Sequence, residues 1–236
     1  MNNRLSPQNW LAREPVKGDD RLVYKYEVDG RELPLRIAGD PALELVNTLA
    51  GWAEATAQQV DYLHDYDDLV VWARECGLVD EMAAARLRRS ARRDRLTADA
   101  VLRETRRLRR DVHDLAVGVG RRAALTRVSA LAIEARQAQV LTATGDSVAW
   151  HFTRDAGLHE PLYAAALAAA ALLSSEAGGH VSACPGDGCG WLFLNASGRR
   201  RWCIMSVCGN RAKARAFAER RQLTSQTSPP SPTPLS

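Results

Sequence analysis

Two pairs of cysteines constrain this chain more than any other feature. Cys184 and Cys189 form the first pair and Cys203 and Cys208 the second, so four thiols fall within 25 residues and each pair has the same four-residue spacer. Two close pairs joined by a short loop can place four sulfur atoms at the corners of a tetrahedron, the arrangement that Zn²⁺ takes in structural sites. The spacing therefore predicts one structural zinc ion held by these four residues.

Other uses of four cysteines stay open. The N-terminal residues have no apolar segment of the kind found in a signal peptide, so we expect a cytoplasmic protein whose thiols stay reduced rather than form disulfides. A redox pair normally has two residues between its cysteines and needs no second pair, whereas an iron–sulfur cluster also takes four thiolates. The fifth cysteine, Cys76, stands alone and is expected to be a buried packing residue.

The residues around the two pairs suit a module held together by metal. A glycine follows the second cysteine of each pair, Gly190 and Gly209, and glycine lets a backbone N–H approach a thiolate sulfur. The apolar residues 191–194 and Trp202 would supply a small core. A module of about 40 residues cannot bury enough surface to fold alone, so the metal must contribute much of its stability.

Basic residues are concentrated in the same part of the chain. Residues 184–221 contain eight arginines and lysines against two acidic residues, which gives this stretch a net charge of +6. The whole chain carries +4, so the remainder is slightly acidic, at −2. The asymmetry predicts a polyanionic partner for the cysteine module, with nucleic acid as the first choice.

Two groups of basic residues are the candidate nucleic-acid contacts. Residues 209–221 have the composition of a helix whose small alanines and protruding arginines could enter a DNA major groove, where arginine pairs with guanine. The loop before Trp202 carries three arginines that could hold phosphates. Alternatively, the arginines only offset the net −2 charge of a zinc centre with four thiolate ligands, although eight basic residues exceed that need. The candidate contacts are Arg199, Arg200, Arg201, Arg211, Lys213 and Arg215.

The rest of the chain predicts a mainly α protein. Apolar residues recur at helical spacing in residues 43–49, 67–75, 81–90, 97–119 and 162–176. Alternating apolar residues on either side of a tight turn predict one β-hairpin in residues 22–37 and a second in residues 139–152. We expect residues 1–20 and the uncharged, proline-rich tail 222–236 to be disordered. The expected fold is a multihelical N-terminal domain with one or two β-hairpins, followed by a small C-terminal zinc finger with four cysteine ligands.

One predicted helix carries a run of arginines beside its apolar stripe. The arginines at positions 103, 106, 107, 109 and 110 lie off this stripe, and nearby acidic residues can pair with them. We therefore expect a solvated outer face rather than a binding patch. The stripe consists of Val101, Thr105, Leu108, Val112, Leu115 and Val119.

The end of the cysteine module, residues 202–213 with the sequence WCIMSVCGNRAK, resembles the signature of the CGNR zinc finger family. In that family the finger follows a helical domain called ABATE, and residues 43–49, LELVNTL, are similar to the opening motif of that domain. The resemblance implies an ABATE-like domain over residues 21–180 and a CGNR finger over residues 181–221. It also implies a stress-induced transcription regulator whose finger binds DNA. Glu44 stands where the family has Asp, and Asn195 begins a triplet where the family has Asp-x-Ser.

Three polar residues of the ABATE-like motif are candidates for a ligand pocket. Glu44, Asn47 and Thr48 would share one face of a helix, opposite Leu45 and Leu49. A few convergent polar groups are enough to bind a small-molecule effector. Such a trio more often makes local hydrogen bonds or faces water, so both interpretations stay open.

These features favour a DNA-binding transcription regulator in which the helical domain senses an effector or mediates self-association, for example as a homodimer. No metalloprotease motif, phosphate-binding loop or nucleophile elbow occurs, so an enzyme is not expected. The alternatives are a small-molecule-binding protein or enzyme with a purely structural finger, and a finger that binds RNA or protein. The longest apolar run, residues 162–173, is too short to span a bilayer, so no membrane contact is expected.

Overall fold

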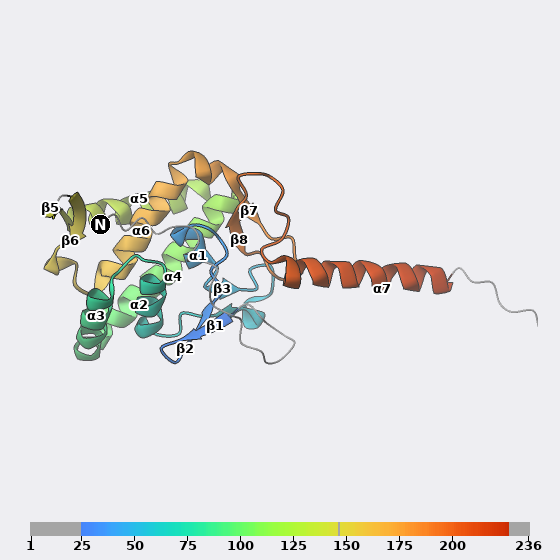
Figure 1. The fold of residues 1–236 in the computed structure, drawn as a ribbon, viewed down its shortest axis with the longest axis horizontal. Helices are drawn as coiled ribbons and strands as arrows, with labels where there is room; N and C mark the ends of the chain where they lie inside the picture. The colour runs from blue at the N-terminus through green and yellow to red at the C-terminus, as the bar shows by residue number, and fades with distance from the viewer. Residues whose placement is uncertain (1–24, 146, 227–236) are drawn as a thin grey trace, which may run out of the picture.

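The protein is built mainly from helices (Figure 1), as seen in a computed structural model that describes residues 25–145 and 147–226. The helices are α1 (Pro41–Val46), α2 (Tyr66–Glu75), α3 (Glu81–Arg93), α4 (Arg95–Val117), α5 (Arg121–Gln137), α6 (Glu160–Leu173) and α7 (Asn210–Gln226). The mainly α fold class is therefore confirmed. The sequence pattern did not reveal α5, whose apolar residues are spread over two faces.

Within the described residues, the strands pair into two-stranded antiparallel sheets. They are β1 (Lys25–Val28) with β2 (Arg31–Pro34), β3 (Leu49–Ala50) with β4 (Val60–Asp61), β5 (Gln139–Thr144) with β6 (Ser147–Phe152), and β7 (Val181–Ala183) with β8 (Leu192–Leu194). The first and third of these are the two predicted hairpins. The short sheets β3–β4 and β7–β8 join segments that are further apart in the sequence, which a turn signal cannot indicate.

Aspartate side chains start four of the helices, where each accepts a backbone N–H that has no partner inside the helix. α4 begins at Arg95, two residues before its predicted start at Thr97, because an aspartate accepts the Thr97 N–H from outside the helix. Gly118, with φ of +82°, ends the same helix in the left-handed conformation that glycine adopts without strain. The four N-caps are Asp40, Asp65, Asp80 and Asp94.

α6 lies at the centre of the helical body and contacts α1, α2, α4 and α5. Its alanines allow these neighbours to approach closely. By length and composition, residues 154–173 are apolar enough to cross a membrane, but just over half of this stretch is buried inside the protein. Gly157, with φ of +51°, also interrupts it, so α6 itself has only 14 residues. These properties are typical of the core helix of a globular domain.

Arg109 departs from the solvated outer face predicted for α4. Its side chain is completely buried, and it donates two hydrogen bonds of 2.7 Å to the Asp61 carboxylate and one of 3.0 Å to the Thr48 hydroxyl. Burial alone would raise the pKa of Asp61. The hydrogen bonds from Arg109 and its positive charge instead hold that pKa below its ordinary value. The prediction was wrong here because Arg109 ties α4 to β4 and to the end of α1.

Two further expectations about α4 and α7 need correction. Val119 is 58% exposed rather than part of the buried stripe, because α4 ends at Val117. α7 continues to Gln226, so residues 222–226 are helical rather than part of a disordered tail. No proline occurs between Gly209 and Pro229, and glutamine and leucine favour the helix. Residues 1–20 and 227–236, which were also expected to be disordered, lie outside the described residues.

Candidate metal centre and nucleic-acid interface

Four cysteine sulfurs meet beside the β7–β8 sheet. Cys184 follows β7 directly, and Cys203 and Cys208 lie on the segment that leads into α7. The four Sγ atoms all lie within 4.8 Å of one another, and the Cys203 sulfur is 3.6 Å from those of both Cys189 and Cys208. Zn–S bonds of about 2.3 Å in a regular tetrahedron require Sγ–Sγ distances of about 3.8 Å. The four residues therefore fit one zinc ion as its complete set of ligands.

The charge of this cluster also points to a bound cation. All four cysteines are free, and three of them are buried. Hydrogen bonds with Cys189, Cys203 and Cys208 hold the pKa of Cys184 far below its ordinary value, whereas contact with Cys184 raises the pKa of Cys203. One thiolate is thus stable among these sulfurs, but its charge opposes a second. A divalent ion removes this opposition and lets all four act as thiolate ligands.

Two glycines allow the first cysteine pair to pack closely. Gly190 has φ of +68°, as expected for the residue after a metal-binding cysteine, and a Cβ there would lie 2.6 Å from the Cβ of Trp52. A Cβ on Gly186 would lie 2.8 Å from the Cys208 sulfur. Both distances are too short for a side chain, so glycine is needed at these positions to bring the loop against the metal centre.

Gly209 behaves differently from the prediction. It does not have a positive φ, and its N–H donates to the Ile204 carbonyl at 3.3 Å rather than to a sulfur. A Cβ at this position would meet the sulfur and terminal methyl of Met205, the flexible end of a half-exposed side chain that can move aside, so glycine is needed less here than at Gly186 and Gly190. The backbone N–H that approaches a thiolate belongs instead to Cys203, which donates to the Cys184 sulfur at 3.4 Å.

The metal centre shares its core with the helical domain. Trp191 and Phe193, predicted to form a core within the finger, pack in one buried cluster with Tyr62 and the cysteines. The indole N–H of Trp191 donates to the Leu49 carbonyl at 2.9 Å. Leu192, which points to the other side of β8, belongs to the main core of the helices. β8 therefore lies between two cores, and the finger depends on the helical domain as well as on metal.

Asn47 makes the most direct link between the two parts. It is the C-cap of α1, and its buried amide donates to the Leu192 carbonyl and accepts from the Leu192 N–H, both at 2.9 Å. The side chain thereby pairs with β8 in the way that a neighbouring strand would. The backbone N–H of Trp52 also donates to the Cys189 carbonyl at 3.1 Å, and this bond joins the β3–β4 connection to the first cysteine pair.

The three candidate ligand-binding residues make hydrogen bonds inside the protein. Glu44 accepts the Ala38 N–H at 2.8 Å, Asn47 pairs with β8, and Thr48 accepts from Arg109. All three are buried. The prediction that they share one helix face was wrong, because α1 ends before the last two of them. Burial raises the pKa of Glu44 to about 7.

Helix α7 projects from the body of the protein beyond the metal centre (Figure 1). In the part of α7 whose side chains are described, residues 210–222, none is fully buried. This part carries five basic residues against one acidic residue, Glu219. Because none of these side chains is buried, α7 gains little from the protein core, and the turn Met205–Gly209 that leads into it, which contains Cys208, is its main anchor.

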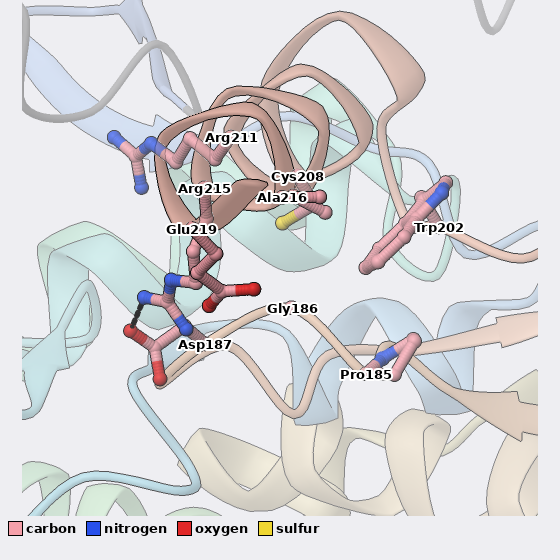
Figure 2. A pocket seen from close by; sticks show the side chains of 10 residues that line it. Pro185, Gly186, Asp187, Trp202, Cys208, Arg211, Arg215, Ala216 and Glu219 are labelled. Carbon is pink, nitrogen blue, oxygen red and sulfur yellow. Dashed lines mark hydrogen bonds and ion pairs between the residues drawn. The ribbon is translucent and has the colours of Figure 1, made fainter. Parts of the chain in front are cut away.

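A cleft of about 240 Å³ lies between the first turns of α7 and the loop of the first cysteine pair. Arg211 and Arg215 line it from the helix, where their spacing of four residues places them on one face, and Trp202 also lines the cleft (Figure 2). Arg215 forms an ion pair with Asp187. The sequence analysis missed Asp187, although it is one of only two acidic residues in the basic stretch.

The three loop arginines have different surroundings. The Arg200 guanidinium lies 4.3 Å from the centre of the Phe193 ring and donates to the Trp202 carbonyl at 3.2 Å. It therefore helps to hold the segment between the two cysteine pairs. Arg199 and Arg201 are exposed, and Arg201 lies over the ring of Trp202. The predicted phosphate contacts fit Arg199 and Arg201 better than Arg200.

Models of two protein families match the chain. Residues 39–176 match the ABATE family, described as "Putative stress-induced transcription regulator", and residues 180–221 match the CGNR zinc finger. The first match alone covers more than half of the 236 residues. No curated protein matches the chain. The predicted order, with a helical domain followed by a cysteine finger, is confirmed by these matches.

Proposed function

Because this chain belongs to the ABATE family and carries a CGNR zinc finger at its C-terminal end, we propose that it is a DNA-binding transcription regulator. The finger makes the DNA contact, and one zinc ion fixes the base of α7. The observation that carries this proposal is α7 itself, a basic helix that extends from the metal centre (Figure 1) and has no buried side chain in residues 210–222.

The dimensions of α7 suit the major groove of DNA. With 17 residues it is about 25 Å long, and a helix with its side chains is about 10–12 Å wide, close to the groove width of about 12 Å. Arg211 and Arg215 lie on one side of its first turns (Figure 2), and helical spacing places Lys213 on another. We assign base contacts to the two arginines and phosphate contacts to Lys213, Arg199 and Arg201.

The ion pair between Arg215 and Asp187 is compatible with this assignment. Both side chains are more than half exposed. Exposed ion pairs contribute at most about 1 kcal/mol, so a DNA base or phosphate can replace Asp187 at little cost. Asp187 holds Arg215 beside the metal centre in the absence of DNA.

Binding of genomic duplex fragments, followed by fluorescence anisotropy over a range of salt concentrations, tests this proposal. The three assigned phosphate contacts predict that log K falls with log salt at a slope of about −3. Arg211→Ala and Arg215→Ala should reduce sequence preference, whereas Arg199→Ala and Arg201→Ala should weaken binding to all sequences. Arg92→Ala, an equal charge change at an exposed position of α3, is the matched control.

A chelator arm tests the role of the metal. The purified chain should contain one zinc per molecule, and its removal should abolish DNA binding, because α7 is anchored at Cys208. Absence of duplex binding at low salt contradicts the proposal, as does full binding after complete metal loss. Stronger competition by structured RNA than by duplex DNA would assign the finger to RNA instead.

In the same proposal the helical domain supplies regulation and no catalysis, and the protein acts in the cytoplasm. The domain regulates either by binding a small effector or by bringing two chains together. The buried hydrogen bonds of Glu44, Asn47 and Thr48 support the other interpretation of these residues, a structural role rather than an effector pocket. Self-association is therefore the more direct route.

A further inference from the structure

Helix α5 has two apolar stripes, of which only one is covered. The inner stripe is buried against the other helices. On the neighbouring face, Leu125, Ala132 and Ile133 form a second, shorter apolar stripe beside Ser129, and Leu125 is 54% exposed and Ile133 57% exposed. A helix with apolar residues on two faces needs a partner on both. Within the described residues, the second stripe of α5 lacks such cover.

A groove of about 410 Å³ runs between this stripe and α6. Its α6 wall consists of Leu167, Ala170, Leu173 and Ser174, and Arg136 is the one charged residue among the described residues that line it. The guanidinium of Arg136 lies 5.1 Å from the centre of the Trp150 ring, so it covers part of the adjoining hairpin. The groove is therefore apolar, floored by small side chains and bordered by large protruding ones.

The apolar face continues onto the β5–β6 hairpin. A second groove, of about 400 Å³, lies on the other side of Leu167, which lines both, and Trp150 lines this second groove. The hairpin exposes four large apolar side chains, which is more than scattered surface residues require. They are Val140, Leu141, Val148 and Trp150. The strand register places Leu141, Val148 and Trp150 on one side of the hairpin and Val140 on the other, so the first three continue the apolar face. Figure 1 shows the hairpin beside α5 and α6, at the opposite end of the molecule from α7.

We propose that this face, formed by α5, α6 and the β5–β6 hairpin, binds a second copy of the same chain. The face contains both the protruding side chains and the grooves that would receive them. A two-fold dimer brings identical faces together, so one surface must carry both parts of the fit. Leu125 and Ile133 of one copy would enter the groove between α5 and α6 of the other.

The charge and the area of this face favour a second copy of the chain over other partners. Apart from Arg136, which lies over Trp150, the described lining of the groove offers no charged group to hold a nucleic acid or an acidic peptide. α5 and α6 side by side present about 25 Å by 20 Å, and the hairpin adds about 20 Å by 10 Å. The total of about 700 Å² approaches the roughly 800 Å² per partner of a standard interface.

The inference deepens the self-association half of the proposed function and does not require DNA binding. Sedimentation equilibrium of the full zinc-loaded chain, without DNA, should give twice the chain mass of 25.9 kDa. Ile133→Glu should weaken the dimer at least about 100-fold, because the two-fold axis places the substitution in both copies. Its circular dichroism should be unchanged, since Ile133 is exposed in the single chain.

Leu96→Glu is the matched control. Leu96 is 85% exposed on the first turn of α4 and lines neither groove, so the dimer should persist. A monomeric wild-type chain at every concentration overturns the inference, whether the face is then open or covered by another part of the chain or by a small molecule. A dimer that survives both Leu125→Glu and Ile133→Glu also overturns it. Because the readout is mass, failure here leaves the DNA contact of α7 to be judged separately.

Discussion

Replacing Asn47 by alanine should loosen the finger from the helical domain. The Asn47 side chain and Leu192 are both buried, and the substitution removes two hydrogen bonds of 2.9 Å between them. The N–H and C=O of Leu192 are then left without partners. Each buried unpaired group costs about 1–3 kcal/mol, so we expect the free energy of unfolding to fall by about 2–5 kcal/mol. That is a large share of the roughly 5–15 kcal/mol typical of a folded protein.

Urea unfolding followed by circular dichroism measures this loss as a lower midpoint. A second readout is the rate at which zinc passes to a coloured chelator, which should rise because β8 holds Trp191 against the cysteines. Asn210→Ala is the control, since Asn210 makes an exposed hydrogen bond to the Ser206 carbonyl and should cost about 0.5 kcal/mol or less. Equal midpoints for the Asn47→Ala and Asn210→Ala variants would refute the reasoning.

Three further substitutions or treatments give equally direct outcomes. Arg109→Met should lower the free energy of unfolding by about 1–3 kcal/mol, because the partly buried Asp61 loses its bidentate partner and keeps only Arg106. Arg107→Met at an exposed position should change it little. Burial raises the pKa of Glu44 from 4.5 to about 7, so the folded state holds its proton more tightly than the unfolded state. The free energy of unfolding should therefore fall by up to about 3 kcal/mol as pH rises from about 4.5 to 7, and Glu44→Gln should flatten this fall. A Glu44→Gln variant whose stability falls with pH as steeply as that of the wild type contradicts the assignment. Chelation should lower the melting temperature of the whole chain rather than of the finger alone, because Leu192 belongs to the main core, and an unshifted helical transition would contradict a shared core.

The metal site could be predicted from sequence because its geometry depends on local spacing. A tetrahedral ion needs four sulfurs, and two short loops with a fixed spacer supply them whatever surrounds them. Helix α7 was predictable for a similar reason, since Gly209 precedes a run of strong helix formers that ends before Pro229. Both features are set within a few residues of the chain.

The residues that join the two parts could not be predicted, because their partners are distant in the sequence. Asn47 and Leu192 are separated by 145 positions, and Arg109 and Asp61 by 48. Helical periodicity marks which positions are apolar, and it places Arg109 off the buried stripe of α4. Only the position of Asp61 beside α4 turns that arginine inward, where a bidentate carboxylate offsets the cost of burying its charge.

The same contacts define how the helical domain acts on the finger. His113 of α4 stacks on Trp52 with ring centres 3.8 Å apart, and the Trp52 N–H donates to the Cys189 carbonyl. Asn47 forms a second connection, from the end of α1 to β8. Any change in the packing of α1 or α4 must therefore alter the support of the first cysteine pair. Cys208, which closes the same metal centre, lies in the turn Met205–Gly209 that leads directly into α7. Zinc binding and the packing of the helical domain stabilise a common core, so each should strengthen the other through the metal centre at the base of the proposed DNA-binding helix.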